Sequence, residues 1–179
     1  QVDDSTAVLK LDLANAFNSV DRQVMLHAAR QFPELVPFSD WCYQDSSHLH
    51  IQGRRIKSTT GVQQGDPLSP LLFCLGMHQA VRTPLDPARS EDVPDVDMCF
   101  FYLDDGLLAG RAESVEAVFR HLRAELATIG LFVDVAKCEL ACAGCSDAPR
   151  NHAIFPQDIK VATAGGFKFL GASIGSKKF

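Results

Sequence analysis

MCFFYLDDGL, at residues 98–107, is the most informative segment of the chain. The unbroken apolar and aromatic run over residues 98–103 predicts a buried strand. Asp-Asp-Gly at residues 104–106 interrupts the run, and apolar residues resume at Leu107. Because Asp-Gly between two apolar runs is typical of a hairpin turn, the segment predicts a buried hairpin with two adjacent carboxylates at its turn.

A second apolar strand is predicted near the start of the chain, in AVLKLDL at residues 7–13. Its leucines alternate with two charged residues, Lys10 and Asp12, so the leucines share one face of the strand and the charges the other. The strand would therefore end in a carboxylate that points away from the core. If both strands end at the same edge of one sheet, Asp12 lies near Asp104 and Asp105.

Clustered carboxylates indicate a site for a cation, because they repel one another and raise one another's pKa unless a cation lies between them. Mg²⁺ accepts such an oxygen-rich environment, and two ions ~4 Å apart can hold the attacking and leaving oxygens of a phosphoryl transfer. A plain turn explains Asp-Asp-Gly when the motif is taken alone. The joint arrangement of the two strands favours the metal site.

The remaining segments predict an α+β fold. The order of elements is strand, helix, helix, hairpin, helix, hairpin, helix and strands, which is typical of an antiparallel sheet with helices packed on one face. Further helices are expected over residues 21–30, 71–81 and 115–129, a hairpin over 48–60, and the last strands over 131–135 and 167–174. That hairpin holds the main basic cluster, Arg54, Arg55 and Lys57, and is the segment expected to contact a phosphate backbone.

Length and composition fit a single folded domain of 179 residues, with 46% hydrophobic and 22% charged residues. No apolar run approaches the roughly 18 residues that cross a bilayer, and the start lacks the layout of a secretion signal, so an intracellular location is expected. A net charge of −5 argues against a nucleic-acid surface, in conflict with the basic hairpin.

Six cysteines without an export signal indicate free thiols rather than a disulfide framework. Cys138, Cys142 and Cys145, with His152 downstream, have a spacing that loosely resembles a zinc site. The spacing matches no standard finger or knuckle closely, so zinc is the less favoured interpretation of these residues.

Five segments in this order resemble the motifs of reverse transcriptases. LKLDLANAF at 9–17, GVQQGDPLSPLLF at 61–73 and FYLDDG at 101–106 resemble motifs A, B and C, and GLFVDVAKCEL at 130–140 and FKFLG at 167–171 are similar to motifs D and E. The match spans nearly the whole chain, and five ordered motifs are far more specific than any one of them. The sequence of the segment at 61–73 is most similar to that of the non-LTR retrotransposon type.

The resemblance implies a polymerase palm over residues 1–179, a single domain of a longer polymerase whose fingers and thumb lie largely outside the chain. It implies an RNA-directed DNA polymerase, in which Asp12 and Asp104 hold two Mg²⁺ ions and Asp105 supports that site or binds metal directly. Phe17 takes the position of the steric gate, which leaves no room for a ribose 2′-hydroxyl and so favours deoxynucleotides.

The resemblance also implies contacts to the nucleotide. Gln64 and Gly65 match the residues that approach the incoming nucleotide and the template, where glycine permits close backbone approach. A plain loop before a helix is the alternative for these two residues. Lys137 matches the lysine that protonates the leaving pyrophosphate, a general-acid role. On sequence alone Lys137 could equally be a solvated surface lysine.

Three further residues are expected on the primer side: Tyr102 beneath the primer end, and Leu170 and Gly171 in the primer grip. A core role suits these positions almost as well. The implied partners are an RNA template, a DNA primer, deoxynucleoside triphosphates and the rest of a retroelement polyprotein in the same chain. No membrane partner is expected, and the location would be nuclear for a eukaryotic retrotransposon.

Two alternatives stay open at this point. A palm like that of RNA-dependent RNA polymerases or nucleotide cyclases would hold metal ions with carboxylates in the same way, although Phe17 and the sequence YLDD at 102–105 favour deoxynucleotides. An inactive retroelement remnant would fold and bind nucleic acid only, although the intact Asp12, Asp104 and Asp105 argue against decay of the site. The isolated chain is expected to be nearly inactive, because without fingers and thumb it cannot hold a triphosphate in line with the primer hydroxyl.

Overall fold

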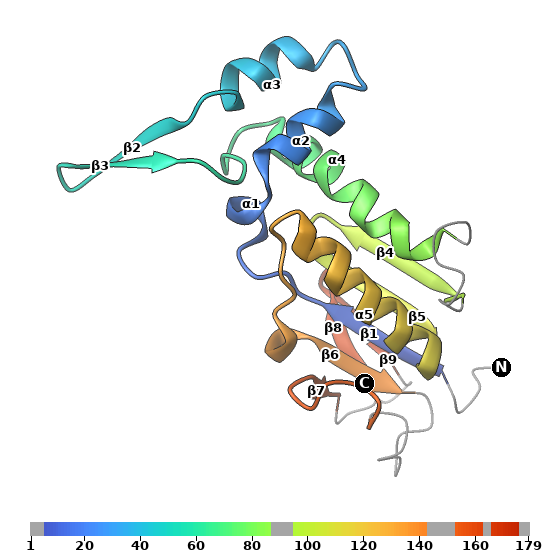
Figure 1. The fold of residues 1–179 in the computed structure, drawn as a ribbon. Coiled ribbons are helices and arrows are strands. Elements are labelled where there is room, and N and C mark those ends of the chain that lie inside the picture. Colours follow the sequence, from blue (N-terminus) through green and yellow to red (C-terminus); the bar gives the residue numbers. More distant parts are fainter. Residues whose placement is uncertain (1–5, 87–94, 143–152, 163–165, 176–179) are drawn as a thin grey trace.

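A five-stranded sheet forms the centre of the molecule (Figure 1). The computed structural model describes residues 6–86, 95–142, 153–162 and 166–175. In the order β4-β5-β1-β6-β7, the strands are β4 (Met98–Tyr102), β5 (Asp105–Arg111), β1 (Thr6–Leu11), β6 (Glu139–Cys142) and β7 (Lys160–Val161). Neighbouring strands run antiparallel except β6 and β7, which are parallel. The predicted α+β fold with an antiparallel sheet is thus confirmed, with β1 as its middle strand.

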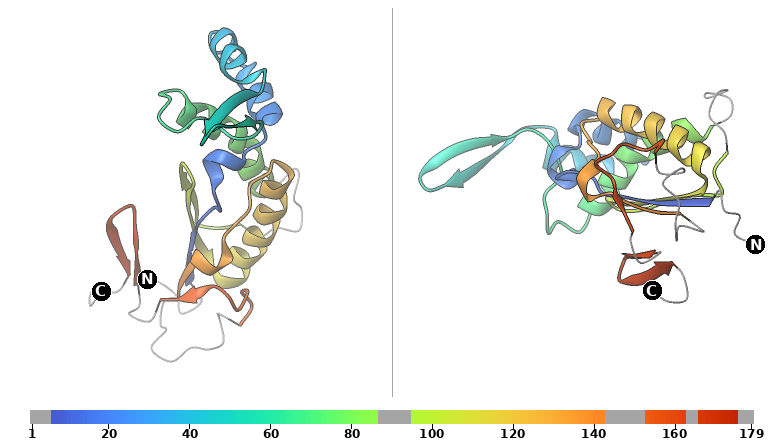
Figure 2. Two further views of the ribbon diagram at one scale, coloured as in Figure 1. Left: turned by 90° about the vertical axis from the view of Figure 1, so that its left-hand side faces the viewer. Right: turned by 90° about the horizontal axis from the view of Figure 1, so that it is seen from below.

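Different elements cover the two faces of this sheet (Figure 2). One face carries the two long helices, α4 (Ser69–Arg82) and α5 (Ala112–Thr128). The other face carries a small hairpin made of β8 (Gly166–Phe169) and β9 (Ala172–Gly175). The helices therefore pack on one face, as predicted, and the opposite face is left to the small hairpin.

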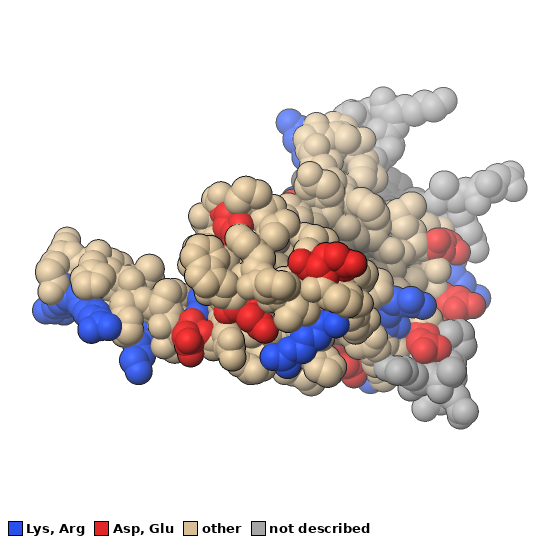
Figure 3. Space-filling view, turned by 90° about the horizontal axis from the view of Figure 1, so that it is seen from above, with Lys and Arg blue, Asp and Glu red and all other residues tan. Residues whose placement is uncertain are grey.

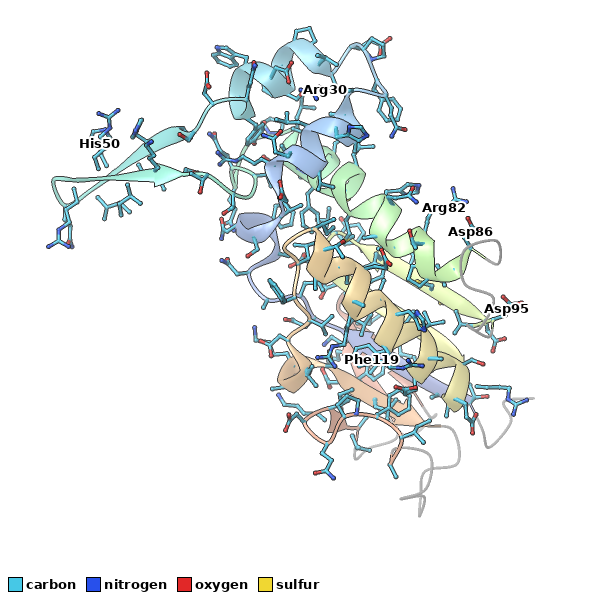
Figure 4. The ribbon with its side chains drawn as sticks, in the orientation of Figure 1. Arg30, His50, Arg82, Asp86, Asp95 and Phe119 are labelled. Atoms are coloured by element: carbon cyan, nitrogen blue, oxygen red, sulfur yellow. The ribbon has the colours of Figure 1, made fainter. Side chains whose placement is uncertain are left out.

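Alternation along β1 sorts its side chains between the two faces. Ala7, Leu9 and Leu11 are fully buried in the core under the helices, whereas Val8 packs against the small hairpin. Phe119 lies between α5 and the sheet (Figure 4), so the apolar stripe of α5 meets the leucines of β1. Lys10 of β1, and Asp12 directly after this strand, consequently lie on the face of the small hairpin.

A second group of elements lies beyond the end of β1 (Figure 1). It comprises α1 (Ala16–Ser19), α2 (Arg22–Ala29), α3 (Val36–Tyr43), β2 (Ser47–Ile51) and β3 (Arg54–Ser58). The β2–β3 hairpin, called the basic arm below (residues 47–58), projects away from the rest of the molecule. It turns at Gln52 and Gly53, where φ is 50° and 76°, and the hairpin predicted over residues 48–60 is confirmed. Two short 3-10 helices, η1 (Thr83–Leu85) and η2 (Val135–Lys137), complete the described helical elements.

The predicted turn at residues 104–106 is wrong in detail. The β4–β5 turn consists of Leu103 and Asp104, because Leu103 adopts a positive φ of 58° and Asp105 already pairs with Tyr102. The Asp-Gly pair that indicated a turn therefore lies within β5.

Two predicted strands are also wrong. Residues 131–135 form only one bridge, between Val133 and Leu13, which follows β1. The strand ends there because the Asp134 carbonyl accepts hydrogen bonds from the Lys137 and Cys138 N–H groups, which close η2. Residues 167–174 form two strands rather than one, because Leu170 and Gly171 have φ of 48° and 82° and turn the chain back.

The described cysteine thiols are free, as predicted; they belong to Cys42, Cys74, Cys99 and Cys138. Burial raises the pKa of the Cys99 and Cys138 thiols to about 11, so both stay protonated at neutral pH. The side chain of Cys142, and all of Cys145 and His152, lie outside the described residues, so the zinc interpretation stays a prediction. Among the helices of the described ranges, none is both long and apolar enough to cross a membrane.

Candidate active site

The pairing of β1 with β5 brings the predicted carboxylates to one end of the sheet. The antiparallel register of these strands, continued one step past its last pair, sets Asp12 opposite Asp105. On the other side Asp105 pairs with Tyr102, and Asp104 occupies the turn between them. Tyr102, Asp105 and Asp12 thus form a row across three strands, called the carboxylate row below, with Asp104 beside it.

The electrostatics of the row reflect crowded negative charge. Burial raises the pKa of the Asp105 carboxyl, the negative charges of Asp104 and Asp12 raise it further, and Lys10 opposes them. Lys10 is itself engaged, because its Nζ lies 2.9 Å from Glu139 Oε1 on the neighbouring strand. The protein therefore neutralises the charge of the row only in part.

Lys137 reaches this cluster from η2. Its Nζ lies 3.1 Å from Asp134 Oδ2 and 3.6 Å from Asp12 Oδ1, although most of the side chain is exposed. The hydrogen bond to Asp134, followed by the negative charge of Asp12, raises the pKa of the Lys137 ammonium group. Lys137 is therefore a protonated, solvent-accessible cation held next to Asp12, and its general-acid role stays a prediction.

The oxygen-only character of this cluster fits Mg²⁺. Within the described ranges, no three carboxylate, histidine or cysteine side chains are already arranged as ligands of one ion. Mg²⁺ does not need such a set, because proteins usually hold it with one or two carboxylates plus the phosphates of a substrate. Asp12 and Asp104, with Asp105 beside them, are the residues that would hold the metal.

Phe17 lies in the short helix that follows Asp12, and α4 supports it. Its ring stacks on Phe73 of α4 with a centroid distance of 4.6 Å and an interplanar angle of 11°. Phe73 is fully buried, whereas Phe17 is only partly buried. The Phe17 carbonyl also accepts a hydrogen bond from the Val62 N–H at 2.7 Å. The predicted gate residue is thus fixed in position while part of its ring stays accessible.

The loop that leads from the basic arm to α4, called the nucleotide loop below (residues 61–68), exposes Gln64 and Gly65. Its start is tied down, because the Gly61 N–H donates to the Val20 carbonyl at 2.8 Å. A Cβ at Gly61 would run into the backbone of α1, so only glycine fits this close approach. Gly65, with a φ of 93°, faces open space. Both predicted nucleotide contacts therefore lie at the free tip of an anchored loop.

Two buried residues that anchor this loop escaped the sequence-based prediction. Arg22 is 5% exposed and donates from Nε to the Gly61 carbonyl at 2.8 Å. Tyr43 is 1% exposed, and its hydroxyl accepts a hydrogen bond from the Gln63 N–H at 3.1 Å. No motif or periodicity links these positions, so nothing in the sequence indicated their shared role.

The three residues predicted to lie on the primer side are found on the face of the sheet that carries the small hairpin. Tyr102 is 57% exposed within the carboxylate row, and Leu170 is 50% exposed at the tip of the β8–β9 turn with Gly171. The hairpin contacts this face of the sheet where the Phe169 ring meets the Phe100 ring at a centroid distance of 6.3 Å. Exposure of this extent rules out the alternative of a core role for Tyr102 and Leu170.

A mostly antiparallel sheet with helices on one face and carboxylates gathered where its middle strands end is the palm of a nucleic-acid polymerase. A sequence profile of the reverse transcriptase (RNA-dependent DNA polymerase) family matches residues 1–174, so the chain belongs to this family. It is 34% identical over 136 residues, or 72% of its length, to a retrovirus-related Pol polyprotein from the type-1 retrotransposable element R2 of Nasonia vitripennis. The family that the five motifs resemble is thus confirmed.

Solved structures of telomerase share this fold. The chain matches telomerase from Candida albicans in complex with a TWJ fragment of telomeric RNA with a TM-score of 0.65 and 13% identity, over 97% of this chain and 31% of that one. Apo telomerase from Candida tropicalis without its C-terminal domain matches with a TM-score of 0.60 and 13% identity, over 95% of this chain and 34% of that one. The chain spans 13% of the length of the R2 relative.

Replacing Asp105 should make stability less sensitive to pH. Because its pKa is raised in the folded state, ionising Asp105 destabilises the fold as pH rises from its unfolded pKa, about 3.9, through the folded value. Asp105→Asn should therefore raise the free energy of unfolding at pH 7, and the gain should vanish below about pH 3.9. Urea denaturation across this pH range, with a chelator present, measures the effect.

Asp45→Asn is the matched control, because it removes the same charge from an exposed position outside the carboxylate row. An Asp105→Asn gain that persists unchanged at low pH, or a loss at neutral pH, would contradict the interpretation of the row as crowded negative charge.

Proposed function

We propose that this domain adds deoxynucleotides to a DNA primer on an RNA template by phosphoryl transfer that depends on two Mg²⁺ ions. The observation that carries the proposal is the carboxylate row, in which Asp12 and Asp105 lie on adjacent strands with Asp104 in the turn. Membership in the reverse transcriptase family supports it. The R2 polyprotein, of which the chain matches a small part, supports a location within a longer retroelement protein.

Each residue of the site has a role that its surroundings support. Asp12 and Asp104 would hold the metal, which when bound stabilises the charge on the transferring phosphoryl group. Asp105 keeps the site negative. Lys137, a protonated cation with free access to solvent, donates its proton from Nζ to the leaving pyrophosphate. Asp134 holds Lys137 at the edge of the site until it does so.

Selection of deoxynucleotides is assigned to Phe17. A phenyl ring offers no hydrogen bond to a 2′-hydroxyl, and a ring that cannot retreat excludes that hydroxyl by contact. The stack on the fully buried Phe73 restricts such a retreat. The gate therefore depends on packing behind Phe17 as well as on its own size.

Asp104→Asn in the full-length polypeptide tests the proposed activity. An amide is a neutral and poor ligand for Mg²⁺, so primer extension should fall by more than the roughly 10- to 100-fold typical of changes outside the ligand set. The circular dichroism spectrum should be unchanged. Glu113→Gln, at an exposed position in the first turn of α5 just beyond the far end of β5, should keep full activity. Absence of extension by the unaltered polypeptide would favour an inactive remnant that only binds nucleic acid.

Phe17→Ala tests the gate. Removing the ring opens space for a ribose hydroxyl, so incorporation of ribonucleotides should rise at least tenfold relative to deoxynucleotides, with a smaller loss of deoxynucleotide use. Primer extension with each nucleotide class gives the ratio. Unchanged discrimination would assign the gate to another residue.

The basic arm supports a contact with the template RNA. Its register pairs His48 with Lys57 and His50 with Arg55, so these four side chains share one face. Arg55 Nη2 lies 3.0 Å from His48 Nδ1, and His50 projects from the same hairpin (Figure 4). Lysine and arginine gather along one side of the arm in Figure 3.

The other face of the arm is mostly apolar, with Arg54 paired to Ile51 at its tip, and the arm as a whole carries no acidic residue between positions 47 and 58. Leu49, Ile51 and Ile56 on that face are each about half exposed. Three positive charges thus gather on a projecting element without acidic residues, in a chain whose net charge is −5. This separation removes the conflict between overall charge and a nucleic-acid surface, because phosphate contacts depend on local charge.

Neutralising the basic face should weaken template binding in a salt-dependent way. Arg55→Gln with Lys57→Gln should lower affinity for single-stranded RNA and reduce the slope of log K against log salt by about 1.4, because each phosphate contact on a single strand contributes about 0.7. Arg30→Gln with Arg82→Gln removes two exposed charges outside the arm and is the control. Equal slope changes in both pairs would contradict a specific role of the arm.

A further inference from the structure

A buried polar cluster lies directly behind the nucleotide loop. At its centre is the hydroxyl of Tyr43, in the last turn of α3. This hydroxyl donates to Asp66 Oδ2 at 3.0 Å, accepts from the Gln63 N–H at 3.1 Å and lies 2.9 Å from Ser69 Oγ. One side chain from a separate helix therefore contacts the residues on both sides of Gln64 and Gly65.

Ser69 and Asp66 complete the cluster from the loop's own end. The Ser69 hydroxyl donates to the Gln63 carbonyl at 2.6 Å, and Asp66 Oδ1 accepts from the Leu68 N–H at 3.0 Å. Both polar groups of the Gln63 backbone are thus held by side chains. The backbone of Gln63 is therefore fixed from behind, although residues 63–65 are all exposed.

Arg22 supports the same cluster by packing against the Tyr43 ring. Its guanidinium carbon lies 5.5 Å from the centroid of the Tyr43 ring, in the geometry of a cation–π contact. Nη1 and Nη2 donate to the carbonyl and the hydroxyl of Ser58 at 2.6 and 2.8 Å, while Nε donates to Gly61. The ring of Tyr43 is therefore packed and oriented independently of its hydroxyl.

We propose that Tyr43 is a positioning residue for the incoming nucleotide: through its hydroxyl it fixes the backbone on either side of Gln64 and Gly65. The inference rests on the proposed function, because it takes these two residues as the nucleotide contacts. Tyr43 is almost fully buried behind the loop and acts through Gln63 and Asp66 rather than by touching substrate.

Tyr43→Phe in the full-length polypeptide tests this role. The phenylalanine ring keeps the packing on Arg22, and only the hydroxyl is lost. KM for deoxynucleotides should rise, and kcat/KM should fall by up to about 100-fold, the cost of misplacing a reactant by about 1 Å. Affinity for primer-template should stay within twofold of the unaltered protein. Trp41→Phe, on the exposed side of the same helix, is the control and should change none of these values.

Ser69→Ala should raise the same KM, because it releases the Gln63 carbonyl. If both hydroxyls act through the loop, the double variant should show less than the product of the two single effects, since residues in one network are not additive. Multiplicative effects, or a loss confined to thermal stability and primer-template affinity with KM unchanged, would overturn the proposal.

Amide hydrogen exchange gives a test that does not depend on activity. Tyr43→Phe should speed exchange of the Gln63 and Leu68 amides, which the cluster holds in hydrogen bonds, at least tenfold relative to amides of β1, whereas Trp41→Phe should not. Unchanged exchange would overturn the positioning role even in an active enzyme. Faster exchange in a polypeptide that shows no primer extension would leave the loop anchor established and contradict the proposed function instead.

Discussion

The antiparallel pairing of β1 with β5 is the constraint on which the rest of the structure depends. Glycine at position 106 favours this pairing, because a Cβ there would stand 2.6 Å from Phe101 Cε1 and 3.1 Å from Leu11 Cβ, and the Phe101 ring would have to move. With hydrogen alone at this position, the Phe101 ring packs across the strand and β1 lies close beside it. A shift of one residue would turn every side chain of β1 to the opposite face. The register therefore sets both the buried leucines and the carboxylates at the end of the sheet.

Charge is separated along the molecule to a degree that the net value conceals. Negative charge gathers at the sheet end, where burial and neighbouring carboxylates raise the pKa of Asp105. Lys10 and Lys137 lie beside that cluster, but each is shared with a second carboxylate, Glu139 or Asp134. Three further basic residues, Arg54, Arg55 and Lys57, lie together on the basic arm, which carries no acidic residue. A site for cations and a surface for phosphates thus coexist in one acidic chain.

Sequence patterns predicted the parts of this site that follow from periodicity. Alternation in β1 was enough to point Asp12 away from the core, and the apolar run before Asp104 was enough to predict β4. The turn at Leu103 was predicted at the wrong residues and the turn at Leu170 was not predicted. Leucine rarely adopts positive φ, and nothing in the local sequence indicates it. Arg22 and Tyr43 could not be found, since their partners lie in other elements and depend on tertiary packing.

The hold of Arg22 on both Ser58 and Gly61 has a mechanical consequence. These residues end the basic arm and begin the nucleotide loop, and a single rigid guanidinium spans them with three hydrogen bonds. The short linker between them therefore cannot absorb a displacement of the arm on its own. The buried Arg22 side chain thus joins the base of the arm to the start of the nucleotide loop. A movement of the arm would therefore be transmitted to the loop.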